Sequence, residues 1–144
     1  MFKLALSAAL LAAICFTTAI GLTTVADAAI AEKLVVKADL IYPEGIAFNP
    51  ATSEFYVSSL RKGTIGAVSE AGTYTEFSSD PDLISTIGMS ADVARGRLLV
   101  CVSDPGVGLR STPKTKETLA RLVVFDLRTK KKLKTLNLGA LKKG

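Results

Sequence analysis

Gly45-Ile-Ala-Phe-Asn-Pro-Ala-Thr-Ser-Glu-Phe-Tyr-Val-Ser58 lies over Gly88-Met-Ser-Ala-Asp-Val-Ala-Arg-Gly-Arg-Leu-Leu-Val-Cys101 without a gap, at an offset of 43 residues. Each copy reads as a short apolar strand, a turn of small or polar residues and a second apolar strand. A period of about 40–45 residues made of short strands is typical of a β-propeller blade. A blade cannot bury both faces of its small sheet alone, so it stacks on neighbours. The stretch from Pro43 to Asp104 therefore predicts an all-β fold of propeller blades, each a four-stranded antiparallel sheet.

Blade one is predicted over residues 43–79 and blade two over residues 86–139. The strands expected in blade one are 46–48, 54–59, 64–68 and 73–77. Those expected in blade two are 88–92, 97–103, 121–126 and 132–138. The run 97–102 is apolar without alternation, which predicts a strand covered on both faces. Two blades alone would leave two apolar faces uncovered.

A further strand is predicted over residues 33–40, ahead of the first repeat. Its sequence, Lys-Leu-Val-Val-Lys-Ala-Asp-Leu, has β-branched residues at its centre and charges towards both ends. It has no repeat unit of its own. In a ring of blades, such a lone strand would complete the last blade and close the circle.

The N-terminal segment, residues 1–28, is predicted to be a secretory signal peptide. Lys3 precedes a nearly continuous apolar stretch, and Ala26-Asp27-Ala28 provides a signal-peptidase site with cleavage after Ala28. This predicts an exported protein, periplasmic or extracellular, without stable membrane association after cleavage. An uncleaved anchor is the alternative, because residues 4–25 are long enough to span a bilayer. A lipoprotein site at Cys15 is disfavoured because Ile14 is bulky where a small residue is expected.

The net charge is +5, from 18 basic and 13 acidic residues, and cleavage would leave it unchanged because one Lys and one Asp leave with the signal. Much of the excess lies in the run 128–134, which we interpret as an exposed turn and edge strand guarded by lysines. A nucleic-acid or heparin patch is the alternative. No aromatic residues interleave with these lysines, so the stacking that single strands require is absent. We therefore expect no nucleic-acid partner.

The chain contains no histidine, which excludes Ser/His/Asp and Cys/His catalysis and histidine zinc sites within these residues. Cys101 is the single cysteine left after cleavage, so no intrachain disulfide is possible. Within the apolar strand 97–103 it is predicted to be a small buried hydrophobe.

The repeat offset changes once, between the second and third strands. Ile65 matches Leu122 at an offset of 57, so blade two carries an insertion of about 14 residues over 105–118. Because blade strands are antiparallel, the insertion is expected on the same rim as Glu44, 81–82 and 85–86. A long loop on that rim is a candidate lid, and a decorative loop is the alternative.

Tyr-Pro-Glu-Gly-Ile-Ala-Phe (42–48), followed by Phe-Tyr-Val-Ser-Ser (55–59) and Gly-Met-Ser-Ala-Asp-Val-Ala-Arg-Gly-Arg-Leu-Leu-Val (88–100), resembles the senescence-marker-protein/gluconolactonase family. The resemblance covers residues 33–140 and implies the N-terminal part of a six-bladed propeller. Many members are exported bacterial proteins.

In that family, a glutamate before the first inner strand binds a divalent metal, usually calcium, at the mouth of the central channel. Glu44 occupies the matching position, and hard cations prefer several converging oxygen ligands. The resemblance thus implies a metal-dependent hydrolase of small lactones or esters, with no catalytic residue assigned. An exposed turn carboxylate is the alternative role for Glu44. The alternative function is a non-catalytic propeller module that binds a ligand or protein partner on the Glu44 rim.

The chain departs from the family pattern in two respects. The remaining family metal ligands come from blades beyond residue 144, and Thr86-Ile87 replaces the usual Asn-Asp pair in blade two. Two blades cannot form a six-bladed ring. Three explanations are open: an N-terminal fragment of a longer protein, which we favour; a homotrimer that closes a ring; or another small β structure. The chain alone is expected to be inactive.

Overall fold

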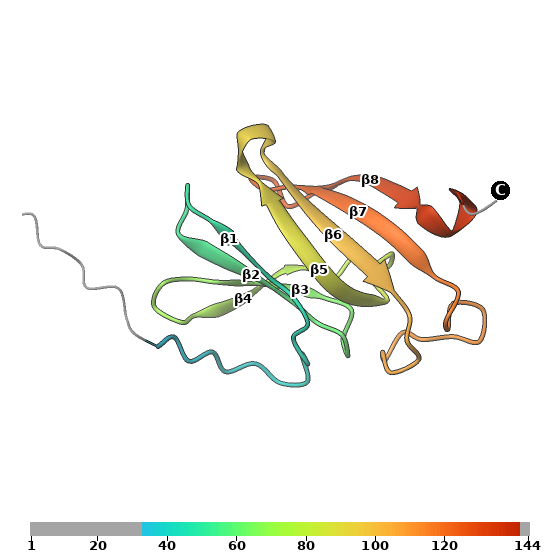
Figure 1. The fold of residues 1–144 in the computed structure, drawn as a ribbon. Coiled ribbons are helices and arrows are strands. Elements are labelled where there is room, and N and C mark those ends of the chain that lie inside the picture. Colours follow the sequence, from blue (N-terminus) through green and yellow to red (C-terminus); the bar gives the residue numbers. More distant parts are fainter. Residues whose placement is uncertain (1–32, 142–144) are drawn as a thin grey trace, which may run out of the picture. The chain divides into compact units, whose positions relative to one another are not determined.

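The computed structural model describes residues 33–141, and the predicted signal peptide and its cleavage site lie outside this range. The described chain forms two four-stranded antiparallel sheets, with only two short 3₁₀ helices (Figure 1). The prediction of an all-β chain with blade-like sheets is confirmed. Among the described residues, no helix is both long and apolar enough to cross a bilayer.

Sheet A is a simple antiparallel meander that corresponds to the first repeat. Its strands, in the order β1-β2-β3-β4, are β1 (Ile46–Asn49), β2 (Glu54–Ser58), β3 (Ile65–Val68) and β4 (Tyr74–Ser78). Each observed strand end lies within one residue of its predicted position. The local signals succeed here because short β-rich runs are separated by Asn, Pro, Ser and Gly, which favour turns.

Sheet B repeats the meander with longer strands. It contains β5 (Ser85–Asp92), β6 (Arg97–Ser103), β7 (Ala120–Asp126) and β8 (Lys132–Asn137), with η1 (Val93–Arg95) between β5 and β6 and η2 (Leu138–Leu141) after β8. Strand β5 begins three residues earlier than predicted. Its first residues pair with the end of the longer β6, and the register shifts between Thr86 and Met89.

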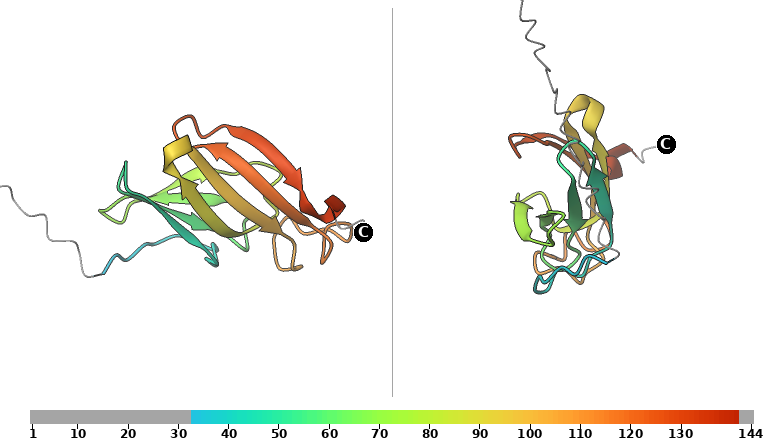
Figure 2. Two further views of the ribbon diagram at one scale, coloured as in Figure 1. Left: turned by 45° about the horizontal axis from the view of Figure 1, so that its top comes forward. Right: turned by 90° about the vertical axis from the view of Figure 1, so that its left-hand side faces the viewer.

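One face of each sheet is buried against the other, and β5 lies beside β1 and β2 (Figures 1 and 2). Aromatic rings span the interface: Phe77 packs edge-on against Tyr56 and against Phe125, with centroid separations of 5.2 and 6.1 Å. The shared core consists of the buried residues Ala47, Tyr56, Ile65, Ala67, Phe77, Leu83, Leu98, Val100, Val102, Val123 and Phe125. We call these two apposed surfaces the closed faces.

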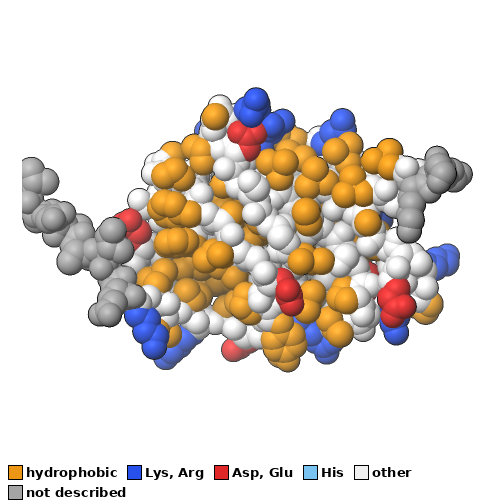
Figure 3. Space-filling view, viewed as in Figure 1, with side chains coloured by type: hydrophobic (Ala, Val, Ile, Leu, Met, Phe, Trp, Pro, Cys, Tyr) orange, Lys and Arg blue, Asp and Glu red, His pale blue; other side chains and the backbone are white. Residues whose placement is uncertain are grey.

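The opposite face of each sheet, which we call its open face, is apolar and only partly covered within the described chain; Val68 on sheet A and Val124 on sheet B are buried there. On sheet A, Ile46 is 65% exposed and Phe48 is 46% exposed, and Figure 3 shows hydrophobic side chains gathered over β1 and β2. On sheet B, Leu99 and Leu122 are half-buried. The expectation that two blades alone leave two apolar faces uncovered is thus confirmed in part.

Two sequence predictions about sheet B are wrong for the same reason. Cys101 is exposed, not buried, and β6 alternates, with Leu98, Val100 and Val102 buried and Cys101 on the open face. A continuous apolar run indicates that both faces favour burial. Covering the second face requires another layer, and the described residues supply only one.

The predicted strand over residues 33–40 is also wrong. The segment ends in a turn at its last two residues and forms no strand in the structure. A strand exists only when a neighbour takes up its backbone hydrogen bonds. β-rich composition alone did not provide that neighbour within residues 33–141.

Candidate functional site

Glu44 lies in the turn that leads into β1, on the rim where β1 and β5 begin. The Ser58 hydroxyl, at the end of β2, accepts hydrogen bonds from the backbone N–H groups of Glu44 (3.1 Å) and Gly45 (2.7 Å). The Ser58 N–H donates in return to the Gly45 carbonyl at 3.0 Å. The backbone beneath Glu44 is therefore fixed, while its side chain is exposed.

Gly45 allows β1 and β5 to approach each other closely at this rim. A Cβ built on Gly45 would overlap the Ile87 carbonyl oxygen and approach the Gly88 Cα at 3.2 Å. Only a residue without a side chain fits this backbone-to-backbone contact. The Glu-Gly pair thus combines a close inter-sheet contact with a solvent-facing carboxylate.

Thr86-Ile87 stands where the family that the sequence resembles usually has a channel-facing Asn-Asp pair. The Thr86 side chain is fully buried, and Oγ1 accepts from the Ser59 N–H at 2.6 Å and lies 2.8 Å from the Thr64 carbonyl, to which it donates. The Thr86 N–H donates to the Ser59 carbonyl at 3.3 Å. Thr86 therefore ties the sheets together and leaves no group free for a ligand.

The insertion 105–118 lies on the Glu44 rim, as predicted, and it is attached to sheet A. The Leu109 N–H donates to the Arg61 carbonyl at 2.8 Å, and the Arg61 guanidinium donates to the Val107 carbonyl. These contacts contradict the interpretation of the insertion as a loose decorative loop. Its role as a lid stays a prediction.

Asp104 organises the insertion from its first residue. Its buried carboxylate accepts hydrogen bonds from the N–H groups of Gly106 (2.9 Å) and Thr112 (3.4 Å) and from the hydroxyls of Ser111 (2.9 Å) and Thr115 (2.6 Å). Burial acts to raise the Asp104 pKa, but these hydrogen bonds outweigh it and hold the pKa below its ordinary value. The carboxylate is ionised and saturated, which is a structural role.

Asp104 should make the free energy of unfolding depend on pH in the acidic range. Because its folded-state pKa is lowered, the stabilisation is present above its unfolded pKa of about 3.9 and is lost as the pH falls through the lower folded value. We expect Asp104→Asn to lower stability at pH 7 by about 2 kcal/mol. The variant's stability should then fall less between pH 5 and pH 2 than that of the wild type.

The measurement is urea unfolding followed by circular dichroism across that pH range. Glu70→Gln is the control, because it removes an exposed carboxylate on the turn between β3 and β4. Parallel stability-versus-pH curves for wild type and Asp104→Asn would contradict this role.

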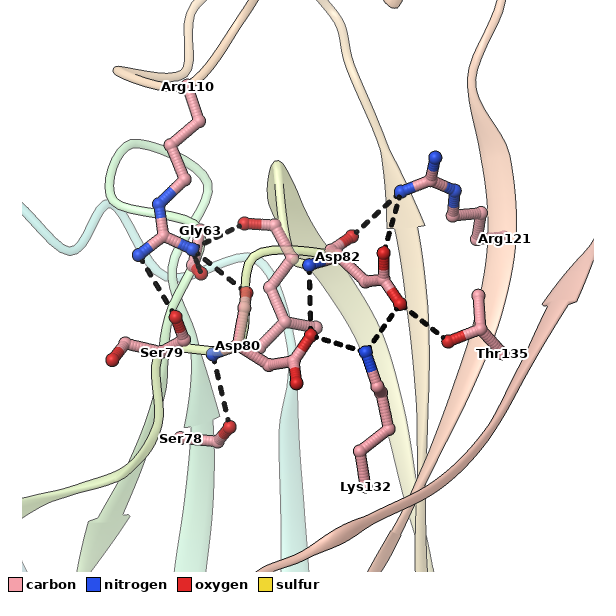
Figure 4. Close-up of polar contacts among 10 residues, drawn as sticks. Gly63, Ser78, Ser79, Asp80, Asp82, Arg110, Arg121, Lys132 and Thr135 are labelled. Carbon is pink, nitrogen blue, oxygen red and sulfur yellow. Dashed lines mark hydrogen bonds and ion pairs between the residues drawn. The ribbon is translucent and has the colours of Figure 1, made fainter.

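Arg110, within the insertion, is occupied by backbone carbonyls. Its guanidinium donates to the carbonyls of Gly63 (3.2 Å), Asp80 (3.0 Å), Leu83 (3.1 Å) and Ser79 (3.2 Å), as Figure 4 shows. These four residues belong to the turn before β3 and the connection between β4 and β5. Arg110 thus clamps the junction of the sheets and is not a free anion-binding cation.

The most charged cluster on this side of the molecule surrounds Asp82. Lys132 Nζ lies 2.9 Å from Asp80 Oδ1 and 2.7 Å from Asp82 Oδ2, the Thr135 hydroxyl donates to Asp82 at 2.8 Å, and Arg121 Nη1 lies 3.5 Å from Asp82 Oδ1 (Figure 4). The Lys132 hydrogen bond, followed by that of Thr135, lowers the Asp82 pKa. The Asp80 and Asp82 bonds raise the Lys132 pKa. The two carboxylates and the two basic groups balance in charge. We therefore assign the cluster a structural role, which is to join the β4–β5 connection to β8.

The described residues do not bring a metal-ligand set together. No group of three or more Cys, Asp or Glu side chains gathers in residues 33–141 so as to hold a metal ion. Glu44 is a hard oxygen donor with a solvent-facing carboxylate, and it can supply one ligand. A complete site at this rim requires ligands from outside the described chain.

Three residues that build the rim, Thr86, Asp104 and Arg110, were not assigned these roles from the sequence. Their partners are distant along the chain; Thr86, for example, bonds 22 and 27 residues away. The one usable signal was the position of Asp104 between a predicted strand and a Gly/Ser/Thr-rich insertion. Aspartate side chains commonly accept a hydrogen bond from the backbone N–H two residues on, as Asp104 does from Gly106.

Comparison with known proteins gives no independent assignment, because neither a family model nor a curated protein matches the chain.

Proposed function

We propose that this chain is an exported pair of propeller blades that contributes Glu44 as one ligand of a divalent metal site, with calcium as the expected ion. The completed propeller would hydrolyse a small lactone or ester. Export would place it in the periplasm or outside the cell. The observation that carries the proposal is a solvent-facing carboxylate at the start of the innermost strand, on a backbone fixed by Ser58 and Gly45.

The residues present support this role in part. Glu44 offers the carboxylate oxygen that Ca²⁺ prefers, and the neighbouring N–H groups are already taken up by the Ser58 hydroxyl. A divalent cation in such a site polarises a carbonyl and lowers the pKa of bound water. Within this chain, Ser58 and Gly45 fix the backbone so that the Glu44 carboxylate lies on the rim. The chain alone is expected to be inactive.

The test is calcium titration by calorimetry, followed by a lactone-hydrolysis assay, on the completed propeller, in which further blades supply the remaining ligands. We expect Glu44→Gln to weaken calcium binding at least tenfold, because the amide lacks the negative charge, and to abolish any hydrolysis. Glu70→Gln, at an exposed glutamate on a turn of the opposite rim, should bind calcium like the wild type. Equal binding by both variants would exclude Glu44 as a ligand.

The alternative is a non-catalytic module that binds a ligand or protein partner on the same rim. Its support is the insertion 105–118, which Asp104 and Arg110 fix beside Glu44's rim as a defined surface. The binding module requires neither calcium nor hydrolysis. Partner binding that persists in Glu44→Gln without calcium would favour it.

A further inference from the structure

We propose that the open face of sheet B docks on the open face of sheet A in a second copy of this chain, in a head-to-tail arrangement. The proposal does not depend on the metal chemistry proposed above. It rests on the internal repeat, which relates the two open faces to the two closed faces that already pack together.

The open face of sheet A corresponds to the closed face of sheet B. At the repeat offset, each open-face residue of β1 and β2 has a counterpart in the interface: Ile46 with Met89, Phe48 with Ala91, Phe55 with Leu98, and Val57 with Val100. Leu98 and Val100 are fully buried by sheet A, while Ile46 is 65% exposed. The open face of sheet A therefore has the composition of a surface that receives a neighbouring sheet.

The open face of sheet B corresponds in the same way to the closed face of sheet A. The pairs are Tyr56 with Leu99, Ser58 with Cys101, Ile65 with Leu122, and Ala67 with Val124. The sheet A members of these pairs are buried against sheet B, whereas on sheet B Cys101 is exposed, Leu99 and Leu122 are half-buried and only Val124 is buried. The open face of sheet B is therefore expected to pack against a surface that resembles the closed face of sheet B. The open face of sheet A is such a surface.

If the contact between the two sheets of one chain is repeated between chains, the open face of sheet B in one copy packs on the open face of sheet A in the next. Such a contact is heterologous, because each copy contributes a different face. The outer strands also carry opposite charges on the two open faces, Glu76 on sheet A and Lys134 on sheet B, both exposed. Repetition closes a ring when the rotation allows it. The homotrimer considered from the sequence would contain three such interfaces.

The segment before β1 does not replace this partner. Val36 and Ile41 line a shallow pocket with Pro43, Ile46 and Val57 at one end of the open face of sheet A. Ile46 nevertheless keeps 65% of its surface exposed. Removing an exposed aliphatic side chain of this size from water is favourable, so the exposed face favours association.

The experiment measures the mass of the protein, purified from cells that express the full chain, by sedimentation equilibrium. We expect a closed assembly with the mass of three chains. Ile46→Asp, on the open face of sheet A, and Cys101→Asp, on that of sheet B, should each reduce the mass to that of one chain. Val107→Asp, at an exposed apolar residue of the insertion, should leave the assembly intact. Circular dichroism checks that all variants remain folded.

Mixing the two defective variants tests the head-to-tail geometry. Each variant retains one intact face, so the mixture should form a dimer and nothing larger. Dissociation by Ile46→Asp with no effect of Cys101→Asp would indicate like-with-like pairing and overturn the proposal. A wild-type monomer at high concentration, or a mass that grows without limit, would overturn it as well.

Thiol reactivity gives an independent readout. Cys101 should react with a thiol reagent at least tenfold more slowly in the wild type than in Ile46→Asp. Ile46 lies on the other sheet, so it can alter Cys101 reactivity in this way only by preventing assembly. Equal rates in two folded proteins would contradict the docking of these faces.

Discussion

Replacing Gly63 with alanine is expected to destabilise the fold by about 3 kcal/mol or more. Gly63 has a φ of 62°, and a Cβ built there would overlap the carbonyl oxygens of Leu83 and Ile84. Those carbonyls belong to the connection that leads into β5, so both sides of the contact are backbone and neither can rotate away. The substitution forces the two sheets apart where Arg110 binds the Gly63 carbonyl.

Thermal unfolding followed by circular dichroism measures the effect. For a domain of about 100 residues, 1 kcal/mol corresponds to roughly 4–8 °C in Tm, so a fall of more than about 12 °C is expected. Gly96→Ala is the matched control, because Gly96 has a φ of 63° and open space around its Cβ position. Left-handed strain alone should cost about 1–2 kcal/mol. Equal losses in the two variants would show that the close approach does not matter.

The contrast between these glycines illustrates which parts of the fold a sequence can predict. Gly63 follows Arg61-Lys62 and Gly96 follows Ala94-Arg95, and both glycines read as turn residues. That local signal placed the ends of β1 to β4 within one residue. Nothing local distinguishes Gly63 from Gly96, because the atoms that forbid a side chain at Gly63 belong to residues about 20 positions away.

The incorrect predictions have a related cause. Burial of Cys101 and a strand over 33–40 both assume a neighbouring layer or strand, and the described chain supplies neither. An apolar sequence indicates that its residues favour burial, but it does not indicate whether a neighbouring layer or strand is present to bury them. The repeat nevertheless predicted that two faces would lack partners.

The position of Glu44 ahead of β1 follows from the repeat and the Pro-Glu-Gly turn, whereas its role as a metal ligand is implied by the resemblance alone and stays a prediction. The rest of the rim depends on side chains that bond across the sheets. The Asp104 carboxylate accepts hydrogen bonds from the insertion 105–118. The Arg110 guanidinium donates to carbonyls of the turn before β3 and of the connection between β4 and β5. Thr86 is the clearest case, since alignment to a family pattern suggested a missing channel group where the structure uses a buried hydroxyl as a bridge.

Replacing Thr86 with valine is therefore expected to destabilise the fold by about 3 kcal/mol. Valine keeps the shape of the side chain but removes the hydroxyl that accepts from the Ser59 N–H and donates to the Thr64 carbonyl. Both partners are buried, so each loses its hydrogen bond without access to water. An unsatisfied buried donor or acceptor costs about 1–3 kcal/mol.

Thr86→Ser is the matched control, because it keeps the hydroxyl and removes one methyl group, at a cost of about 1 kcal/mol. Urea unfolding gives the stabilities, and hydrogen exchange of the Ser59 amide reports the bond directly. Protection of that amide should fall in the valine variant and persist in the serine variant. If valine is tolerated as well as serine, the junction does not depend on the hydroxyl, and Thr86 becomes available for a role in binding. If valine alone fails, the chain uses the Thr86 hydroxyl to join its two sheets, and Thr86 is not a ligand-binding residue.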